Sequence, residues 1–352
     1  MNQTLCSIKG SLPQLAYLRI HGADAESFLQ SQLTNDVLAL RSSGHAQWTG
    51  YCNPKGRLFF TGWLARTASA SDEFALLIDR SLSQVMVKRL KMFVLRSKVT
   101  IEDLSDRYVL QGTIDLPTTI HTRPREAQPT RTLPTEAQPT HTLPTEAQPT
   151  HTQPADPTPA LSIGLPIAHT LMANFGRSVQ CLDAQAQTKS MEANVDSEDF
   201  SGVWRWLHLL AAEPWITQTL SERFVPQMLN FERLGGVNFR KGCYPGQEVV
   251  ARSQYLGRLK RRSGIYQIDD PLRRLPAEGE DLGEASNPDL SVVNVLRCPG
   301  SLGMSLWQSA FAGMPAHAQA AHALVLAEGR IDLEDSPLGP SITLPYALSD
   351  DA

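Results

Sequence analysis

The chain has 352 residues, of which 41% are hydrophobic and 19% charged, and its formal net charge is −4. Its apolar runs are much shorter than the roughly 20 residues that cross a bilayer, and no basic and then apolar leader opens the sequence, so we expect a cytoplasmic protein without a membrane-spanning helix. The acidic balance argues against a protein that binds nucleic acid through an overall positive charge, so any contact with a polyanion must be a local patch.

The first part of the chain alternates strand and helix patterns. Residues 16–20 (AYLRI) form an apolar run typical of a strand, and apolar side chains recur at helical spacing over residues 23–33. Asp24, near the start of the second stretch, has a side chain suited to a helix N-cap. The two patterns predict a strand followed directly by an amphipathic helix.

The next patterns predict two neighbouring strands and a helix that covers them. Residues 57–66 and 73–79 are strand-like, whereas residues 82–95 have the apolar spacing of a helix. The side chains expected to face the strands are Leu82, Val85, Met86, Leu90 and Phe93. We expect residues 1–120 to form an N-terminal α+β domain with an antiparallel sheet.

Residues 121–160 contain a repeat. The unit EAQPT recurs at positions 126, 136 and 146, and the segment is rich in Pro and Thr with almost no apolar side chains. Burial cannot offset the entropy of ordering such a segment, and its prolines remove backbone donors. We predict a disordered insertion, favouring an expanded surface loop over a recognition tail.

Beyond the repeat the sequence again has the patterns of folded structure. Residues 161–248 form a second α+β segment, in which residues 201–210 predict a helix that ends before Pro214. Residues 249–352 contain short apolar runs separated by Pro and Gly, a spacing typical of a small β-barrel or sandwich. These runs are residues 263–268, 290–295 and 323–326. We predict a C-terminal β-barrel domain over residues 249–352.

One cysteine stands in an unusual setting. The five cysteines are scattered, with no C-x-x-C pair and no Cys/His cluster, so neither a disulfide scaffold nor a metal site is predicted. In KGCYPGQE, however, Cys243 follows Lys241 and lies between Gly242 and Gly246, which permit positive φ and a sharp turn that exposes the thiol. Neighbouring cations favour the thiolate. Over the alternative of an inert buried thiol, we predict a reactive surface cysteine.

Two further features leave alternatives open. The basic run GRLKRR (257–262) is able to contact phosphates or a polyanionic cofactor tail, or to protect a solvated strand edge. Trp204, Trp206 and Trp215 lie around the end of the predicted helix. They are either core side chains or a stacking face for a flat heteroaromatic ligand.

Five segments resemble a known family. They are FLQSQLTNDV (28–37), CNPKGRL (52–58), FVPQMLN (224–230), KGCYPGQEVVAR (241–252) and LPYAL (344–348). In this order, and over nearly the whole chain outside the repeat, they are similar to segments of the YgfZ family of folate-binding proteins associated with tRNA modification. The most specific segment is KGCYPGQE, which matches the family signature K-G-C-Y-x-G-Q-E in full.

The resemblance implies a multi-domain α+β ring similar to the T-protein, the aminomethyltransferase of the glycine cleavage system, with tetrahydrofolate in a central cavity. It also implies that Cys243 is the functional thiol and that Trp204 contacts the folate. The motif residues that accompany Cys243 are Lys241, Gly242, Tyr244, Gly246, Gln247, Glu248 and Arg252.

The resemblance further implies a role in iron–sulfur metabolism. Family members support the assembly or maintenance of iron–sulfur clusters in a subset of enzymes, including those that methylthiolate tRNA. We therefore expect a folate-binding accessory protein without ordinary catalytic activity, whose partners are iron–sulfur enzymes or cluster-assembly proteins. Neither tight direct nucleic-acid binding nor membrane association is expected, because the chain is acidic and lacks a basic stripe interleaved with aromatic residues.

The alternative function is a tetrahydrofolate-dependent aminomethyltransferase. That chemistry needs a carboxylate beside the folate. T-proteins have an aspartate pair after a glycine in the first domain, and the corresponding stretch of this chain, KGRLFF, has Phe59 and Phe60 there instead. A hydrolase that pairs Cys243 with His208 is less favoured still, because nothing in the sequence brings a base and an orienting acid to the thiol.

Overall fold

The computed structural model describes residues 5–40, 45–67, 72–117, 161–165, 176–183, 197–257, 259–284, 287–300, 303–304, 306, 322–331, 336–338, 341–342, 344 and 348. The repeat segment 121–160, predicted to be disordered, lies outside the described residues. The described chain contains three antiparallel sheets, and the main hydrophobic core extends over all three.

The first sheet has four strands and joins parts of the chain from both sides of the repeat. Its order is β1-β7-β9-β8, and each neighbouring pair is antiparallel. The strands are β1 (Leu5–Ser11), β7 (Tyr108–Pro117), β9 (Gly176–Asp183) and β8 (Leu161–Leu165). The segments that precede and follow the repeat are therefore held in one sheet.

The second sheet carries most of the N-terminal core. Its order is β3-β4-β5-β2-β6. The strands are β2 (Leu15–His21), β3 (Ala46–Cys52), β4 (Leu58–Arg66), β5 (Glu73–Asp79) and β6 (Thr100–Asp103). The strands predicted at 16–20, 57–66 and 73–79 are confirmed, and β4 and β5 are neighbours as expected. Because β4 is buried from Leu58 to Ala65, it is covered on both faces.

Two helices, α1 (Ala25–Gln32) and α2 (Ser83–Val94), confirm the predicted helices of this region. Helix α2 packs against β2 and the edge strand β6. At this edge it buries a narrow stripe of side chains, so Val85 and Phe93 are 43% and 42% exposed and their predicted inward positions are wrong. Asp24 is the N-cap residue of α1, as predicted, but its carboxylate makes no capping hydrogen bond and instead accepts the backbone N–H of Lys98 at 2.7 Å.

The third sheet lies in the C-terminal part and has the order β11-β12-β13-β10-β14. Its strands are β10 (Arg261–Ile268), β11 (Asp281–Glu284), β12 (Asn287–Arg297), β13 (Ala323–Arg330) and β14 (Ser341–Ile342). The three apolar runs predicted as strands are confirmed as β10, β12 and β13. Within the described residues, however, β11 and the two-residue β14 stay at opposite edges and do not pair. The predicted closed barrel is therefore not confirmed.

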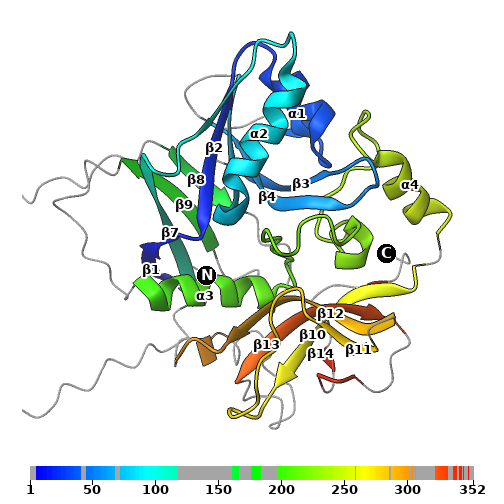
Figure 1. Ribbon diagram of the computed structural model, residues 1–352. Coiled ribbons are helices and arrows are strands. Elements are labelled where there is room, and N and C mark those ends of the chain that lie inside the picture. Colours follow the sequence, from blue (N-terminus) through cyan, green and yellow to red (C-terminus); the bar gives the residue numbers. More distant parts are fainter. Residues whose placement is uncertain are drawn as a thin grey trace, which may run out of the picture.

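Helix α3 (Ser197–Leu210) connects the first and third sheets (Figure 1). It includes the helix predicted over 201–210 and ends before Pro214. It contacts β1 on one side and β12 and β13 on the other. Gly10 of β1 permits the close approach, because a Cβ at that position would lie 2.3 Å from the ring of Phe200.

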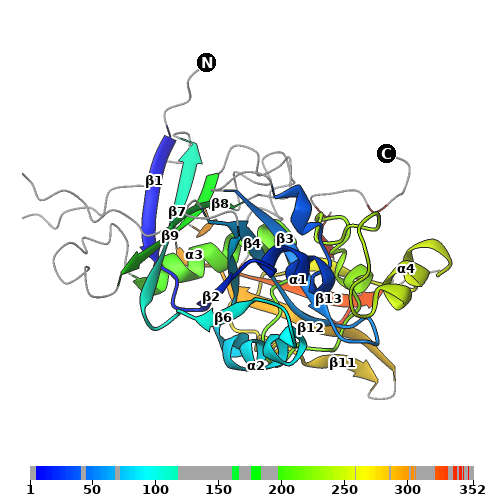
Figure 2. The same cartoon turned by 90° about the horizontal axis from the view of Figure 1, so that it is seen from above.

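Helix α4 (Gln247–Tyr255) directly follows the KGCYPG turn (241–246). It lies at the end of the molecule opposite to the first sheet, as both views show (Figure 1 and Figure 2). Among the helices of the described ranges, none combines the length and apolar character that crossing a bilayer requires.

Candidate functional site

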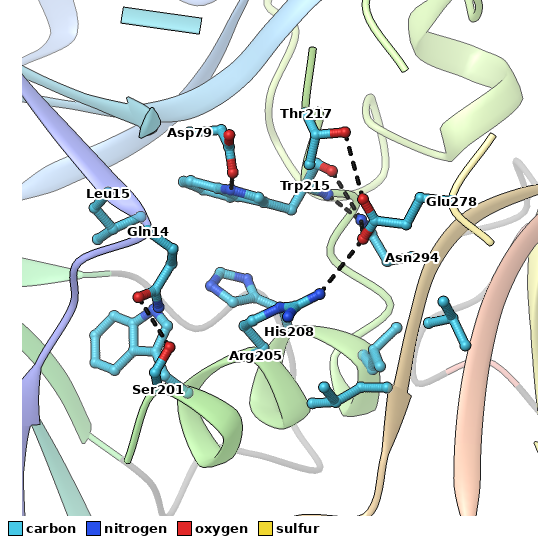
Figure 3. A pocket seen from close by; sticks show the side chains of 14 residues that line it. Gln14, Leu15, Asp79, Ser201, Arg205, His208, Trp215, Thr217, Glu278 and Asn294 are labelled. Carbon is cyan, nitrogen blue, oxygen red and sulfur yellow. Dashed lines mark hydrogen bonds and ion pairs between the residues drawn. The ribbon is translucent and has the colours of Figure 1, made fainter. Parts of the chain in front are cut away.

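A cavity of about 240 Å³ lies where the N-terminal part, α3 and the third sheet meet (Figure 3). The N-terminal part contributes Gln14, Leu15 and Asp79, while β12 contributes Asn294 and its two successors. The walls thus come from segments far apart in the sequence. Ligand sites commonly occur at such junctions between structural units.

Trp215 forms an aromatic wall of this cavity and is held at both its ring and its backbone. Its indole Nε1 donates to Oδ2 of Asp79 at 2.9 Å. Its backbone N donates to Oδ1 of Asn294, and its carbonyl accepts from Nδ2 of Asn294, both at 2.9 Å. The half-buried indole therefore has a fixed orientation toward the cavity.

Trp204, the predicted folate-contacting residue, also lines the cavity but is only 1% exposed. Its ring packs against Phe200, Trp63 and His208. Its buried indole Nε1 has no hydrogen-bond partner among the residues that the structure describes. Trp206 points elsewhere, with its Nε1 donating to the carbonyl of Gly303 at 3.0 Å, so of the three tryptophans Trp204 and Trp215 line the cavity and Trp206 serves the core.

A carboxylate, Glu278, faces the cavity from the loop before β11. It is loosely held, because Nδ2 of Asn294, Oγ1 of Thr217 and Nη2 of Arg205 lie 3.3, 3.4 and 3.5 Å from its oxygens. Burial raises the pKa of Glu278, and the charge of Asp79 adds to the rise, against the opposing effects of Asn294, Arg205 and Thr217. The cavity therefore contains two carboxylates, at Asp79 and Glu278.

Beneath the cavity wall, three charged or titratable side chains form a buried network. Oε1 of Glu213 accepts from Nη2 of Arg177 at 2.9 Å, and Oε2 lies 2.8 Å from Nδ1 of His208. All three side chains are almost fully buried. His208 itself reaches the cavity and packs against the ring of Trp215. Its contacts are with Glu213 and the surrounding indoles rather than with the Cys243 thiol, so the hydrolase pairing receives no support.

Sequence reasoning missed Asp79, Glu278 and the network around Glu213. Asp79 ends a strand and Glu278 lies in a polar loop, so neither position carries a local signal. The tertiary fold alone brings them together.

The Cys243 loop is a second site, to which several segments of the predicted family pattern converge. The hydroxyl of Thr34 donates to the carbonyl of Gly236 at 2.6 Å, and Nε2 of Gln227 donates to the carbonyl of Val250 at 2.7 Å. The thiol of Cys243 is exposed, as predicted. Its reactivity stays a prediction.

Lys241 supports this loop from inside. Its ammonium donates to the carbonyls of Gln30 and Leu33, both at 2.5 Å, at the C-terminal end of α1. Burial lowers the pKa of Lys241 to about 8, against the opposing charges of Asp36 and Cys243. The side chain is 8% exposed, so it anchors the loop to α1 rather than standing beside the thiol as a solvated cation.

Gly246 and Gly242 differ in their backbone. Gly246 has φ +78°, as predicted, and a Cβ there would lie 2.3 Å from the carbonyl oxygen of Asn53 and 2.7 Å from Cα of Gly56. Gly242 has no positive φ and would accept a Cβ without contact, so the prediction for Gly242 is wrong. The sharp turn therefore comes after the cysteine, at Gly246, where the backbone of the loop packs closely against that of residues 52–58.

The remaining motif residues occupy the turn and α4. Tyr244 is buried, and its pKa is raised by this burial and by the nearby Cys52. Gln247 and Glu248 begin α4, and Arg252 lies in its last turn, with Glu248 and Arg252 exposed.

The two sites are separate. No residue between Lys241 and Arg252 lines the cavity, and α3 and α4 lie apart in both views (Figure 1 and Figure 2). Over the described part of the chain, no three His, Cys, Asp or Glu side chains are grouped to hold a metal ion. The structure therefore does not bring Trp204 and Cys243 together.

Two cations of the basic run are neutralised locally. Arg261 makes a two-bond pair with Glu328 at 2.8 and 2.9 Å, and Arg262 lies 2.8 Å from Glu232. These contacts count against a phosphate platform at Arg261 and Arg262. The strand-edge interpretation is not confirmed either, because β10 lies between β13 and β14 in the sheet.

No family model matches the sequence. The structure is similar to the glycine cleavage system aminomethyltransferase T from Bartonella henselae, with a TM-score of 0.55 and 13% identity over 94% of this chain and 80% of that one. At this identity the likeness shows the fold, and it confirms the T-protein-like arrangement that the sequence implied.

Sequence relatives are closer. The chain is 30% identical over 274 residues to the tRNA-modifying protein YgfZ of Enterobacter sp. (strain 638), which covers 77% of this chain and 74% of the relative. The YgfZ proteins of Cronobacter sakazakii and Yersinia pestis are each 31% identical over 277 residues, with the same coverage. With this identity over about three quarters of both chains, and with the signature loop built as described, the chain belongs to the family of the tRNA-modifying protein YgfZ.

Proposed function

We propose that this protein binds tetrahydrofolate in its cavity and acts in the cytoplasm as an accessory protein that supports the assembly or maintenance of iron–sulfur clusters. Through cluster-dependent enzymes it thereby supports the methylthiolation of tRNA. The observation that carries the folate part is the cavity itself, in which a fixed indole faces two carboxylates, at Asp79 and Glu278.

These residues suit tetrahydrofolate. Trp215 offers an aromatic face to a pteridine ring, and carboxylates accept hydrogen bonds from the N–H groups of that ring. The buried Nε1 of Trp204 has no partner in the described chain and is a donor for a ring oxygen or nitrogen. Arg205, whose side chain is 46% exposed, is a cation for the glutamate tail. When bound, tetrahydrofolate supplies a reduced pteridine that accepts or carries a one-carbon unit.

The chain's own contribution at this site is binding and orientation. Asp79 and Asn294 fix Trp215 from opposite sides of the cavity. Since these two residues come from β5 and β12, Trp215 links the N-terminal part to the third sheet.

Cys243 is the second functional element of the proposal. One thiolate does not complete the usual four-thiolate shell of a cluster, so a cluster bound there is shared with a partner, either an iron–sulfur enzyme such as a tRNA methylthiolation enzyme or a cluster-assembly protein. The relatives named for tRNA modification support this link. Because Arg261 and Arg262 are paired with carboxylates, we assign the link to the modifying enzyme rather than to tight direct binding of tRNA.

Titration calorimetry with tetrahydrofolate tests the folate part. We expect binding to the wild-type protein and a roughly tenfold loss in Trp204→Phe, because the smaller ring removes the indole donor and part of the cavity wall. Trp206→Phe is the matched control, since Trp206 lies on the same helix, is equally buried and does not line the cavity. Equal affinities of the two variants, or no binding to the wild type, would contradict the assignment.

A strain that carries Cys243→Ala tests the accessory role. We expect it to lose most of its methylthiolated tRNA, measured by mass spectrometry of tRNA nucleosides, because the exposed thiol is the group offered to cluster or partner. Cys298→Ala provides the control, as this thiol is half-buried and contacts the carbonyl of Gly300. Wild-type levels of the modification in the Cys243→Ala strain would refute the role.

The aminomethyltransferase is the second candidate, and one observation favours it. The sequence lacked the carboxylates expected at Phe59 and Phe60, which are buried in the core, yet the cavity contains Asp79 and Glu278. Transfer of a one-carbon unit to tetrahydrofolate that is lost in Glu278→Gln would favour the transferase; absence of transfer in a protein that binds tetrahydrofolate would favour the accessory role.

A further inference from the structure

His208 is a titratable side chain of the cavity that the proposed function leaves without a task. It is 5% exposed yet forms part of the cavity wall. Figure 3 shows its ring between the helix and the indole of Trp215, and the two ring centroids are 5.3 Å apart. A ligand that stacks on Trp215 will therefore lie beside the imidazole of His208.

One edge of the His208 ring is fixed by a carboxylate. Nδ1 lies 2.8 Å from Oε2 of Glu213, whose other oxygen accepts from Nη2 of Arg177 at 2.9 Å. Burial alone would raise the pKa of Glu213, but the charge of Arg177 and the contact with His208 lower this pKa to about 2. Nδ1 and Oε2 are not aligned as a hydrogen bond. An ionised carboxylate 2.8 Å away nevertheless only accepts hydrogen bonds and repels a lone pair, which favours the neutral tautomer with its proton on Nδ1. The lone pair is then on Nε2, at the opposite edge of the ring.

The surroundings keep this ring neutral. Burial lowers the pKa of His208. The contact with Glu213 opposes this decrease, whereas the positive charges of Arg177 on β9 and Arg205 on α3 lower the pKa further. Asp79 and Glu278 are the other charged groups of the cavity wall. The rest of the ring is packed against indoles, with centroids 5.1 Å away for Trp63 and 6.1 Å for Trp48. The rings of Trp48 and Trp204 meet the imidazole at an edge, and those of Trp63 and Trp215 are tilted against it. Among the residues that the structure describes, none makes a hydrogen bond to Nε2, so its lone pair is available to a ligand.

We propose that Nε2 of His208 is the hydrogen-bond acceptor by which the cavity selects its ligand, a flat heterocycle that presents an N–H donor, and that Glu213 is the positioning residue that holds the acceptor tautomer. This inference rests on the proposed function in taking tetrahydrofolate as the ligand, since its reduced pteridine carries such N–H groups. Protonation of His208 converts Nε2 from acceptor to donor, and ligand binding weakens.

The first test measures the tautomer and needs no ligand. In protein labelled with ¹⁵N-histidine, the His208 signals are those that disappear in His208→Phe. We expect a protonated Nδ1 and an unprotonated Nε2 at neutral pH, and a shift toward the other tautomer in Glu213→Gln, whose amide is able to donate as well as accept. A wild-type protein with the proton on Nε2, or with a charged imidazole, would overturn the inference whether or not tetrahydrofolate binds.

The second test measures the affinity for tetrahydrofolate by calorimetry over a range of pH. We expect wild-type affinity to fall as the pH is lowered through the midpoint at which the Nε2 signal titrates. His208→Phe, which keeps a flat ring, should bind about tenfold more weakly at pH 8 and lose this pH dependence. Glu213→Gln should weaken binding several-fold at the same pH, with circular dichroism showing that the variant is folded.

His322→Phe is the matched control, because His322 is exposed at the start of β13 and outside the cavity; its affinity should equal that of the wild type. If the wild type binds tetrahydrofolate and His208→Phe binds it equally well, the inference about His208 is wrong while the proposed function stands. If the wild type does not bind tetrahydrofolate, the proposed function fails, and the tautomer measurement still decides whether Nε2 is an acceptor.

Discussion

Replacing Glu213 with alanine is expected to lower the free energy of unfolding by about 3–5 kcal/mol. The side chain is fully buried and holds Arg177 of the first sheet and His208 of α3 through contacts of 2.9 and 2.8 Å. Alanine would leave a guanidinium and an imidazole buried without the carboxylate that faces them. A loss of this size is a large part of the stability of an ordinary domain. Urea unfolding followed by circular dichroism at pH 7.5 measures it.

Two other variants separate the lost charge from the lost volume. Asp281→Ala removes a carboxylate from the solvated pair with Arg223 and should cost less than about 1 kcal/mol. The double variant Arg177→Met/Glu213→Leu replaces the buried pair by apolar side chains and should recover much of the loss. A loss in Glu213→Ala no greater than that in Asp281→Ala would contradict a structural role for the network.

The contribution of Glu213 also has a defined pH range. Its folded pKa of about 2 lies below the usual value of 4.5, so the unfolded chain takes up the proton first as the pH falls. The stabilisation is therefore fully present above about pH 4.5 and is lost as the pH falls toward 2.

Gly246→Val is expected to have the second largest effect, because it forces apart two loops that meet backbone to backbone. At φ +78° a side chain is strained, and its Cβ would lie 2.3 Å from the carbonyl oxygen of Asn53. We expect a loss on the order of 2–3 kcal/mol in unfolding free energy. Cys243 precedes this turn by three residues. Bacteria that carry Gly246→Val should therefore also lose tRNA methylthiolation, although the thiol is intact.

Gly242→Ala is the matched substitution within the same loop. It has no positive φ and no atom within 4 Å of its built Cβ, so the free energy of unfolding should stay within about 0.5 kcal/mol of the wild type. Equal unfolding free energies for Gly242→Ala and Gly246→Val would show that the close approach to residues 52–58 does not constrain the loop.

Local patterns of sequence were sufficient for the elements whose burial follows a simple period. The strands β2, β4 and β5 and the helices α1 and α3 were predictable because apolar runs or helical spacing mark them. The positive φ of Gly246 and the exposure of Cys243 were also predictable, because glycine permits positive φ and a sharp turn among polar residues exposes its side chains. The domain boundaries stay predictions.

Features that depend on tertiary contacts were not predictable. Periodicity placed Val85 and Phe93 inward, but it does not reveal that α2 covers only the edge of a sheet. Lys241 looked like a cation beside the thiol, whereas the fold turns it toward the end of α1. Asp79 and Glu278 line the same cavity only because the end of β5 and the loop before β11 approach each other in the fold, and no spacing in the sequence predicts this approach.

The pairing of the first sheet has a consequence for how this gene is able to change. Leu161 and Leu110 both pair with Cys181, so the chain that leaves β7 at Pro117 must return about 24 Å along the sheet and about 10 Å across it. Roughly eight to ten extended residues cover that path, and residues 118–160 supply several times as many. Gaining or losing one ten-residue unit then alters the loop-closure free energy by only about 0.2 kcal/mol. The number of repeats is therefore nearly neutral to folding, and closely related strains are expected to differ in it.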